Sequence, residues 1–251
     1  MTKCNAGAGW RFEAYAVCYI NQRNPAGTDR ALVAHPAGLA IIGIGSLASF
    51  CEGGLPNLNL PGMSSRLSGY VTVIALEWIS VLLVWLALRR RGMSFGDLVG
   101  GSWSSAGKFL RDLGLGVALI VVIVPTASTL VRLLGVRSDK TLALLTPKTY
   151  FELLVWLVLA WTAAFGEELV FRGYLMRQFG GWTGSHAAGL ILQGVAFGLA
   201  HGYYRQAMLA IMVHGWLLGL LAWWRKSLRP GMLAHGVQDS LGGIVAFITI
   251  K

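Results

Sequence analysis

Residues 70–88 read YVTVIALEWISVLLVWLAL, an apolar run in which Glu77 is the single charged residue. A helix needs about 20 apolar residues to cross the hydrocarbon core of a bilayer, and this run has that length. Three arginines, Arg89, Arg90 and Arg91, follow it directly. The run therefore predicts a transmembrane helix that charge stops at a membrane surface.

Further apolar runs follow along the chain. We predict six clear spans, and a seventh near the start, where 38–52 (GLAIIGIGSLASFCE) is either a tilted span or a re-entrant piece. Residues 92–112 mix glycine, serine and charged residues and predict an interfacial or amphipathic segment. The six clear spans are 70–88, 113–135, 149–176, 186–202, 207–224 and 231–250. The expected fold class is all-α, a polytopic transmembrane helical bundle of about seven spans, with tilted or broken helices around an intramembrane polar cavity.

The composition agrees with a membrane protein. The chain has 251 residues, of which 55% are hydrophobic and 13% are charged. Soluble domains have roughly 25% charged residues, so a soluble globular enzyme and a disordered chain are excluded. The net charge is +10, but the basic residues lie mostly between the apolar runs. Topology and contact with anionic lipid explain this charge better than nucleic acid, which we do not expect as a partner.

The last third of the chain places charges where a bilayer disfavours them. Glu168 and Arg172 are four residues apart, so they share a helix face and can form an ion pair. Glu167 is turned about 100° away from Glu168 and lacks that cation. This spacing predicts a structural role for Glu168 and leaves Glu167 available for chemistry. The alternative is that both carboxylates brace the end of a helix.

Two histidines follow in the next apolar runs. His201 comes four residues after Phe197 in an apolar context, where a single histidine is usually a packing residue. His235 and Asp239 are also four apart, so the carboxylate can orient the imidazole. Together with Glu167 they suit hydrolysis: a carboxylate as general base, an imidazole to position water, and a polar pair for the oxyanion.

These residues resemble a known family. EELVFRG at 167–173, FGLAH at 197–201 and HGVQD at 235–239 are similar to the three ordered motifs of the CPBP family. This is the CAAX-processing endopeptidase and bacteriocin-processing family of intramembrane proteases, often called Abi in bacteria. The resemblance covers about residues 150–245.

The resemblance implies a role for each motif residue. Glu167 would activate the attacking water, His201 would help to position it, and His235 with Asp239 would form the oxyanion site. Three residues would support them: Glu168, Arg172 and Phe197. The family commonly has asparagine where this chain has Asp239. An ionised aspartate cannot donate a hydrogen bond to an oxyanion, so this departure bears on activity.

The function expected from the resemblance is intramembrane endopeptidase activity by Glu-activated water. The expected substrate is a membrane-anchored protein or peptide within the lipid bilayer. No cofactor is assigned; the alternative is zinc, with Glu167, His201 and His235 as ligands. Two other functions stay open. One is a non-catalytic immunity or scaffold protein, and the other is a proton-coupled transporter, which also uses intramembrane carboxylates and histidines.

Charge and motif positions predict the organisation of the chain. Residues 1–112 would form a variable N-terminal region with one or two spans and an interfacial segment. Residues 113–251 would form the catalytic core, with its motifs in 167–239, and the two would make one structural unit. A cytoplasmic N-terminus puts 14 lysines and arginines inside and 6 outside, which the positive-inside rule favours. If the source is bacterial, we expect the inner membrane.

Overall fold

The structure is a computed structural model that describes residues 58–90, 92–136 and 145–249. These residues form a helical bundle, and no strand occurs among them, so the predicted all-α class is confirmed. The predicted piece at 38–52 lies outside the described residues. The helices are α3 (Ser65–Arg89), α4 (Phe95–Val99), α5 (Ala106–Leu133), α7 (Tyr150–Glu167), α8 (Met176–Thr183), α9 (His186–Ala200), α10 (Met208–Arg225) and α11 (Arg229–Thr249). A π-helical segment, Glu168–Leu175, joins α7 to α8, and a 3-10 segment, Gly202–Ala207, precedes α10.

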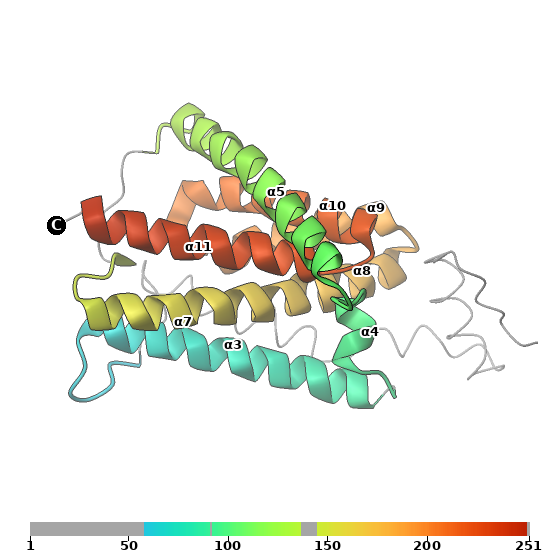
Figure 1. The fold of residues 1–251 in the computed structure, drawn as a ribbon, viewed down its shortest axis with the longest axis horizontal. Helices are drawn as coiled ribbons and strands as arrows, with labels where there is room; N and C mark the ends of the chain where they lie inside the picture. Colours follow the sequence, from blue (N-terminus) through green and yellow to red (C-terminus); the bar gives the residue numbers. More distant parts are fainter. Residues whose placement is uncertain (1–57, 91, 137–144, 250–251) are drawn as a thin grey trace, which may run out of the picture.

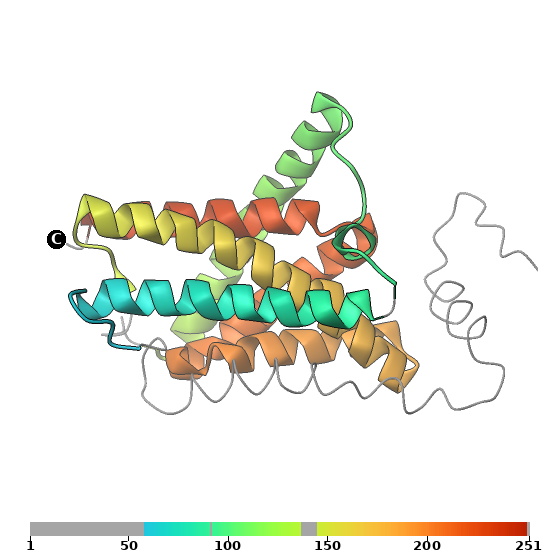
Figure 2. The ribbon, with the colours of Figure 1, turned by 90° about the horizontal axis from the view of Figure 1, so that it is seen from below.

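Helix α7 lies between α3 and α11 (Figure 1). Helices α3 and α7 run in the same direction, and α11 runs against them. Tyr150 at the start of α7 therefore meets Phe247 near the end of α11, with ring centroids 5.2 Å apart. Helix α9 packs on α8 and α10, and α5 crosses α10 and α11 at a steep angle (Figure 2).

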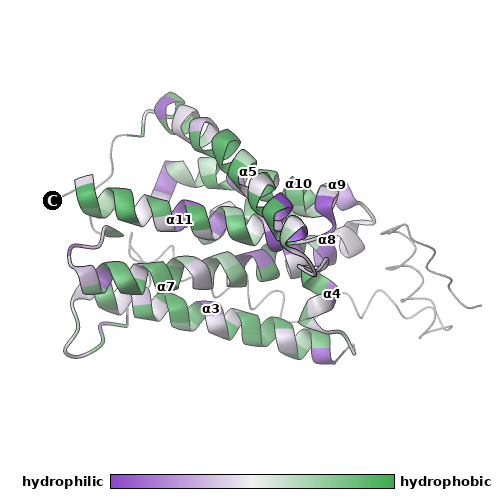
Figure 3. Ribbon diagram, in the orientation of Figure 1, coloured by the Kyte–Doolittle hydropathy of each residue, from purple (hydrophilic) through white to green (hydrophobic). Residues whose placement is uncertain are grey.

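Four helical stretches are long and apolar enough to cross a membrane: Ser65–Arg89, Ala106–Leu133, Tyr150–Thr183 and Gly202–Arg225. Hydrophobic residues extend along most of α3, α5 and α7 (Figure 3). Helix α9 is apolar but has only 15 residues. Helix α11 has 21 residues but is less apolar than predicted, because polar side chains interrupt it. These lengths and compositions indicate an integral membrane protein.

Helix α5 begins earlier than the predicted start at 113. The Ser105 side chain accepts a hydrogen bond from the Lys108 backbone N–H, as an N-cap residue does, and the helix starts at Ala106. Helix α5 includes Asp112 even though this residue is charged. Its side chain is buried, and its Oδ1 lies 3.4 Å from Nη2 of Arg225 in α10. The predicted interfacial segment 92–112 thus contains α4 and the first turns of α5.

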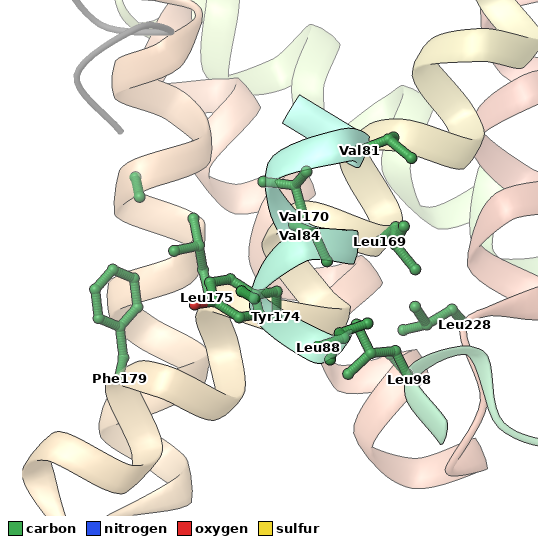
Figure 4. Close-up of a cluster of buried hydrophobic side chains, with 13 residues drawn as sticks. Val81, Val84, Leu88, Leu98, Leu169, Val170, Tyr174, Leu175, Phe179 and Leu228 are labelled. Atoms are coloured by element: carbon green, nitrogen blue, oxygen red, sulfur yellow. The ribbon is translucent and has the colours of Figure 1, made fainter. Parts of the chain in front are cut away.

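A core of apolar side chains holds the π-helical segment against α3 (Figure 4). Val84 and Leu88 of α3 and Leu169 and Leu175 of the π-helical segment are each at most 2% exposed. Because Leu169 follows Glu168 directly, this packing fixes where the carboxylate of Glu168 lies.

The starting ends of α3 and α7 are joined by polar contacts. Arg66 pairs with Glu152 at 3.1 Å, and the Ser64 hydroxyl donates to the same carboxylate at 3.0 Å. The Tyr70 hydroxyl donates to the Leu145 carbonyl oxygen. These contacts fix the register of α3 along α7.

Close contact between α9 and α10 depends on glycine. A Cβ on Gly215 would lie 3.0 Å from the Cα of Gly194 and 3.1 Å from the Phe197 ring. We therefore expect Gly215→Ala to lower stability by about 1–3 kcal/mol, the usual cost of overpacking. The measurement is the thermal unfolding midpoint of the purified protein in detergent.

Gly181 of α8 is the matched control for this substitution. A Cβ there meets nothing within 4 Å, so Gly181→Ala should leave the midpoint unchanged or raise it slightly. Equal midpoints for Gly215→Ala and the unsubstituted protein would show that the two helices can separate without cost.

Candidate active site

Two adjacent carboxylates lie where α7 changes into the π-helical segment. Glu168 is fully buried, and its Oε1 lies 2.9 Å from Nη1 of Arg172, which is also buried. The Arg172 guanidinium sits 4.0 Å from the centroid of the Phe197 ring. Glu167 takes no part in this pair and is 9% exposed. The ion pair expected from the spacing is present, and it lies in a π-helical turn, a feature frequently found at functional sites.

Glu167 lies between two imidazoles. Its Oε1 is 3.7 Å from Nε2 of His201, and its Oε2 is 3.6 Å from Nε2 of His235. The other ring nitrogen of His201 lies 2.8 Å from the Phe197 carbonyl oxygen. That oxygen only accepts, so Nδ1 of His201 carries a proton, and in the neutral ring Nε2 presents a lone pair to the site. The structure thus brings together three of the predicted residues.

The path of the chain explains how His201 reaches this level. Straight spans of the predicted lengths would hold it apart from Glu167. Instead, the helix continues through the π-helical segment and α8 to Thr183, and α9 then runs back from His186 beside α8. Both legs have about 15 residues, or roughly 22 Å, so the return ends opposite Glu167.

His235 and Asp239 lie on one face of α11, as their spacing predicts. Nε2 of His235 is 3.4 Å from Oδ2 of Asp239, and its Nδ1 is 3.5 Å from Oε1 of Glu168. Carboxylates therefore flank both nitrogens of the His235 ring. The Asp239 side chain is 34% exposed, so the cluster is accessible from this side.

Phe197 is central to the cluster. Its ring centroid lies 4.7 Å from that of His201 and 6.3 Å from those of His214 and His235. His214 matches none of the three motifs. The structure places it 5.9 Å from the His235 ring, with its Nε2 buried and without a hydrogen-bond partner in the described part of the chain.

In the sequence, Glu77 is the single charged residue of the apolar run 70–88, and no motif accounts for it. The register of α3 brings its carboxylate against the backbone of α7 at Gly166, where any larger side chain would collide with it. It also interacts electrostatically with Glu167 and His235. Glu77 therefore belongs to the site, although no motif contains it.

Two aromatic residues beside His201 were also not foreseen. Tyr203 and Tyr204 lie in the 3-10 segment that follows α9, with ring centroids 5.8 Å and 6.4 Å from that of His201. They form one wall of the site. Aromatic residues are common in membrane helices, so nothing in the sequence distinguishes these two.

The zinc alternative concerns Glu167, His201 and His235. Among residues 58–90, 92–136 and 145–249, no three or more histidine, cysteine, aspartate or glutamate side chains are arranged to hold a metal ion. The separations from Glu167 to the two imidazoles exceed a direct hydrogen bond and leave room for a bridging water. In addition, Oε2 of Glu167 is buried without a hydrogen-bond partner among the described residues. The chemistry these residues can perform by themselves is the activation of a water.

A family model described as type II CAAX prenyl endopeptidase Rce1-like matches residues 149–241. The matched range contains all four residues predicted to be catalytic: Glu167, His201, His235 and Asp239. Residues 149–241 are similar to this family over that range, and we refer to them as the Rce1-like domain. The resemblance to the CPBP family is thereby confirmed, and the domain is that of a protease family. No curated protein and no solved structure was found to match the chain. Glu77 lies outside the Rce1-like domain.

Proposed function

We propose that the Rce1-like domain cleaves a peptide bond in a membrane-anchored protein or peptide, with Glu167 as the general base. The supporting observation is the position of Glu167 between His201 and His235, at 3.7 Å and 3.6 Å, within a helical membrane protein. A carboxylate in this place can accept a proton from a water that an imidazole holds.

The reaction follows from these positions. A water between Glu167 and His201 gives one proton to the Glu167 carboxylate, and its oxygen attacks the carbonyl carbon of the substrate. The electron pair of the carbonyl π bond moves to oxygen and forms an oxyanion. When the C–N bond breaks, the oxyanion pair restores the carbonyl, and the departing nitrogen takes the proton from Glu167. Water is consumed, and the carboxylate is regenerated.

His235 is placed to help the oxyanion. A ring N–H of His235 can donate to the developing charge, and its carboxylate neighbours hold the ring in orientation. Glu168 does this from one side at 3.5 Å and Asp239 from the other at 3.4 Å. Asp239 is thus an orienting residue and not itself a donor when ionised.

The surface of α7 suits a substrate with a hydrocarbon anchor. A groove of about 470 Å³ runs along α7 beside Trp78 of α3, and its lining is apolar apart from Thr162. Phe165, at one end of the groove, is two residues from Glu167. A lipid chain in this groove would bring an attached peptide close to the carboxylate.

The charge distribution supports one orientation in the membrane. We place the N-terminus on the cytoplasmic side, in the inner membrane if the source is bacterial, because that choice puts most lysines and arginines inside. Cleavage would then take place in a cavity that opens to the cytoplasm.

The test compares membranes that hold the unsubstituted protein with membranes that hold Glu167→Gln. Small membrane-anchored proteins and peptides are compared by mass spectrometry. A processed species that is present only with the unsubstituted protein supports the proposal and gives the cleavage site. Identical profiles, with both proteins shown to be folded and present, would favour a non-catalytic membrane protein or a transporter.

Glu152→Gln is the matched control for this comparison. Glu152 is also a buried glutamate of α7, but it lies at the other end of the helix, paired with Arg66. Its substitution should leave processing intact. Loss of processing with both variants would indicate that damage to α7, and not loss of the base, stops cleavage.

A further inference from the structure

The oxyanion site proposed for this chain has His235 as its donor. Asp239 stands where the related motif has an asparagine, and a carboxylate only accepts hydrogen bonds. It lies 3.4 Å from the His235 ring, so its negative charge is close to where an oxyanion would form. His235 alone would then have to donate to that oxyanion. A second donor nearby would complete the site.

Tyr203 and Tyr204 provide hydroxyl groups at this place. The centroids of the two rings lie 4.4 Å apart. The Tyr204 ring is nearly parallel to the His201 ring, with 12° between their planes. Both side chains are partly exposed, so a substrate can reach them. They therefore line the site on the His201 side.

Both phenols lie within electrostatic range of two carboxylates of the site. Both phenols interact electrostatically with Glu167 and with Asp239, and they hydrogen-bond to each other. For Tyr204 the interaction with Asp239 is the stronger of these two carboxylate contacts, whereas for Tyr203 it is the interaction with Glu167.

The backbone at this segment is held in an unusual conformation. Arg205 has φ 54° and ψ −123°, a conformation that residues with a side chain rarely adopt. Such a residue costs on the order of 1–3 kcal/mol and tends to occur where function requires a fixed geometry. The Tyr204 N–H donates to the His201 carbonyl oxygen at 3.0 Å, which ties the tyrosines to the catalytic histidine.

We propose that Tyr204 donates its phenolic O–H to the oxyanion, in the place of the missing asparagine amide, while Tyr203 holds the Tyr204 hydroxyl in position. This inference rests on the proposed peptidase function. The bond is a hydrogen bond, so the proton stays on the phenol while the carbonyl electron pair moves to oxygen and back. Tyr204 is then a catalytic residue, and Tyr203 is a positioning residue.

The test uses a peptide that spans the cleavage site found in the membrane comparison, labelled with a fluorophore and a quencher. The full chain is assayed in detergent micelles. Tyr204→Phe should lower kcat about 10²-fold or more with little change in KM, the usual effect of removing one oxyanion donor. Tyr203→Phe should lower kcat by about five- to tenfold, because it removes only one supporting hydrogen bond.

A rescue experiment separates catalysis from structure. Asp239→Asn supplies an amide N–H at the same site, so in the Tyr204→Phe protein it should restore kcat by about tenfold or more. A tyrosine that only packs, or that only marks the membrane interface, gives no such rescue.

Tyr150→Phe is the control for loss of a phenol elsewhere. Tyr150 is 82% exposed at the start of α7 and should keep full activity. The unsubstituted protein must cleave the peptide; failure there overturns the peptidase proposal itself. If that condition holds and Tyr204→Phe keeps kcat within twofold, or loses it without rescue by Asp239→Asn, the role assigned to Tyr204 is wrong.

Discussion

Glu167→Gln should lower kcat for peptide hydrolysis by about 10²- to 10⁴-fold, the contribution typical of a positioned general base. Glutamine has nearly the same shape as glutamate but cannot accept a proton from water at neutral pH. Within the described part of the chain, the imidazoles beside Glu167 lie at 3.6 Å and 3.7 Å, longer than a direct hydrogen bond. The substitution should therefore change the thermal unfolding midpoint little.

The measurement is kcat and KM for the labelled peptide, with the unfolding midpoint of each variant in the same detergent. Glu152→Gln gives the opposite pattern, because it weakens an ion pair with Arg66 far from the site. It should lower the midpoint and leave kcat nearly unchanged. A Glu167→Gln protein that keeps more than a tenth of kcat would show that another group activates the water.

The helical motifs were predictable because their geometry is local. Residues four apart on a helix share a face, so the pairs Glu168–Arg172 and His235–Asp239 follow from spacing alone. The rotation of about 100° between adjacent residues also separates Glu167 from Glu168. Long apolar runs predicted the membrane helices for the same reason, since each run is judged by its own length and composition.

The rest of the site depends on packing between distant segments. The extension of the α7 helix through a π-helical turn brings His201 level with Glu167, and no local pattern predicts such a turn. Glu77 reaches the site because contacts at the far ends of α3 and α7 set their register. Tyr203 and Tyr204 lie in the segment directly before Arg205, whose backbone conformation its residue type does not favour.

The ends of the helices also depend on contacts between distant segments, which local sequence does not predict. The sequence predicted an interfacial segment up to 112, because glycine, serine, Trp103, Lys108 and Arg111 are mixed there. In the structure Asp112 is buried between Arg111 and Arg225, at 3.2 Å and 3.4 Å. A charged residue that forms an ion pair with another helix can be buried within its own helix, so it does not mark the end of that helix.

Arg172→Met should destabilise the protein by about 3–5 kcal/mol, the usual cost of leaving one member of a buried ion pair without its partner. Both side chains of the Glu168–Arg172 pair have no exposed surface, and their atoms are 2.9 Å apart. The substitution also removes the cation from the face of the Phe197 ring, 4.0 Å away. The measurement is the free energy of unfolding, or the unfolding midpoint where unfolding is irreversible.

Arg66→Met provides a matched control at the other end of α7. The Arg66 side chain is 19% exposed, and its partner Glu152 keeps hydrogen bonds from Ser64 and from the Lys148 backbone. We expect its loss to cost about 1 kcal/mol, as for a partly exposed pair. Equal losses for the two arginine variants would mean that burial of the Glu168–Arg172 pair does not set its contribution.

The double variant Glu168→Gln/Arg172→Met separates stability from catalysis. It removes both charges, so most of the lost stability should return, as it does when a buried pair is replaced as a unit. Activity should not return to the same extent, because Glu168 also lies 3.5 Å from Nδ1 of His235 and orients that ring. A double variant that regains stability but stays impaired in kcat would assign Glu168 to the positioning of His235. If kcat recovers together with stability, the pair only supports the fold, and the orientation of His235 must come from Asp239.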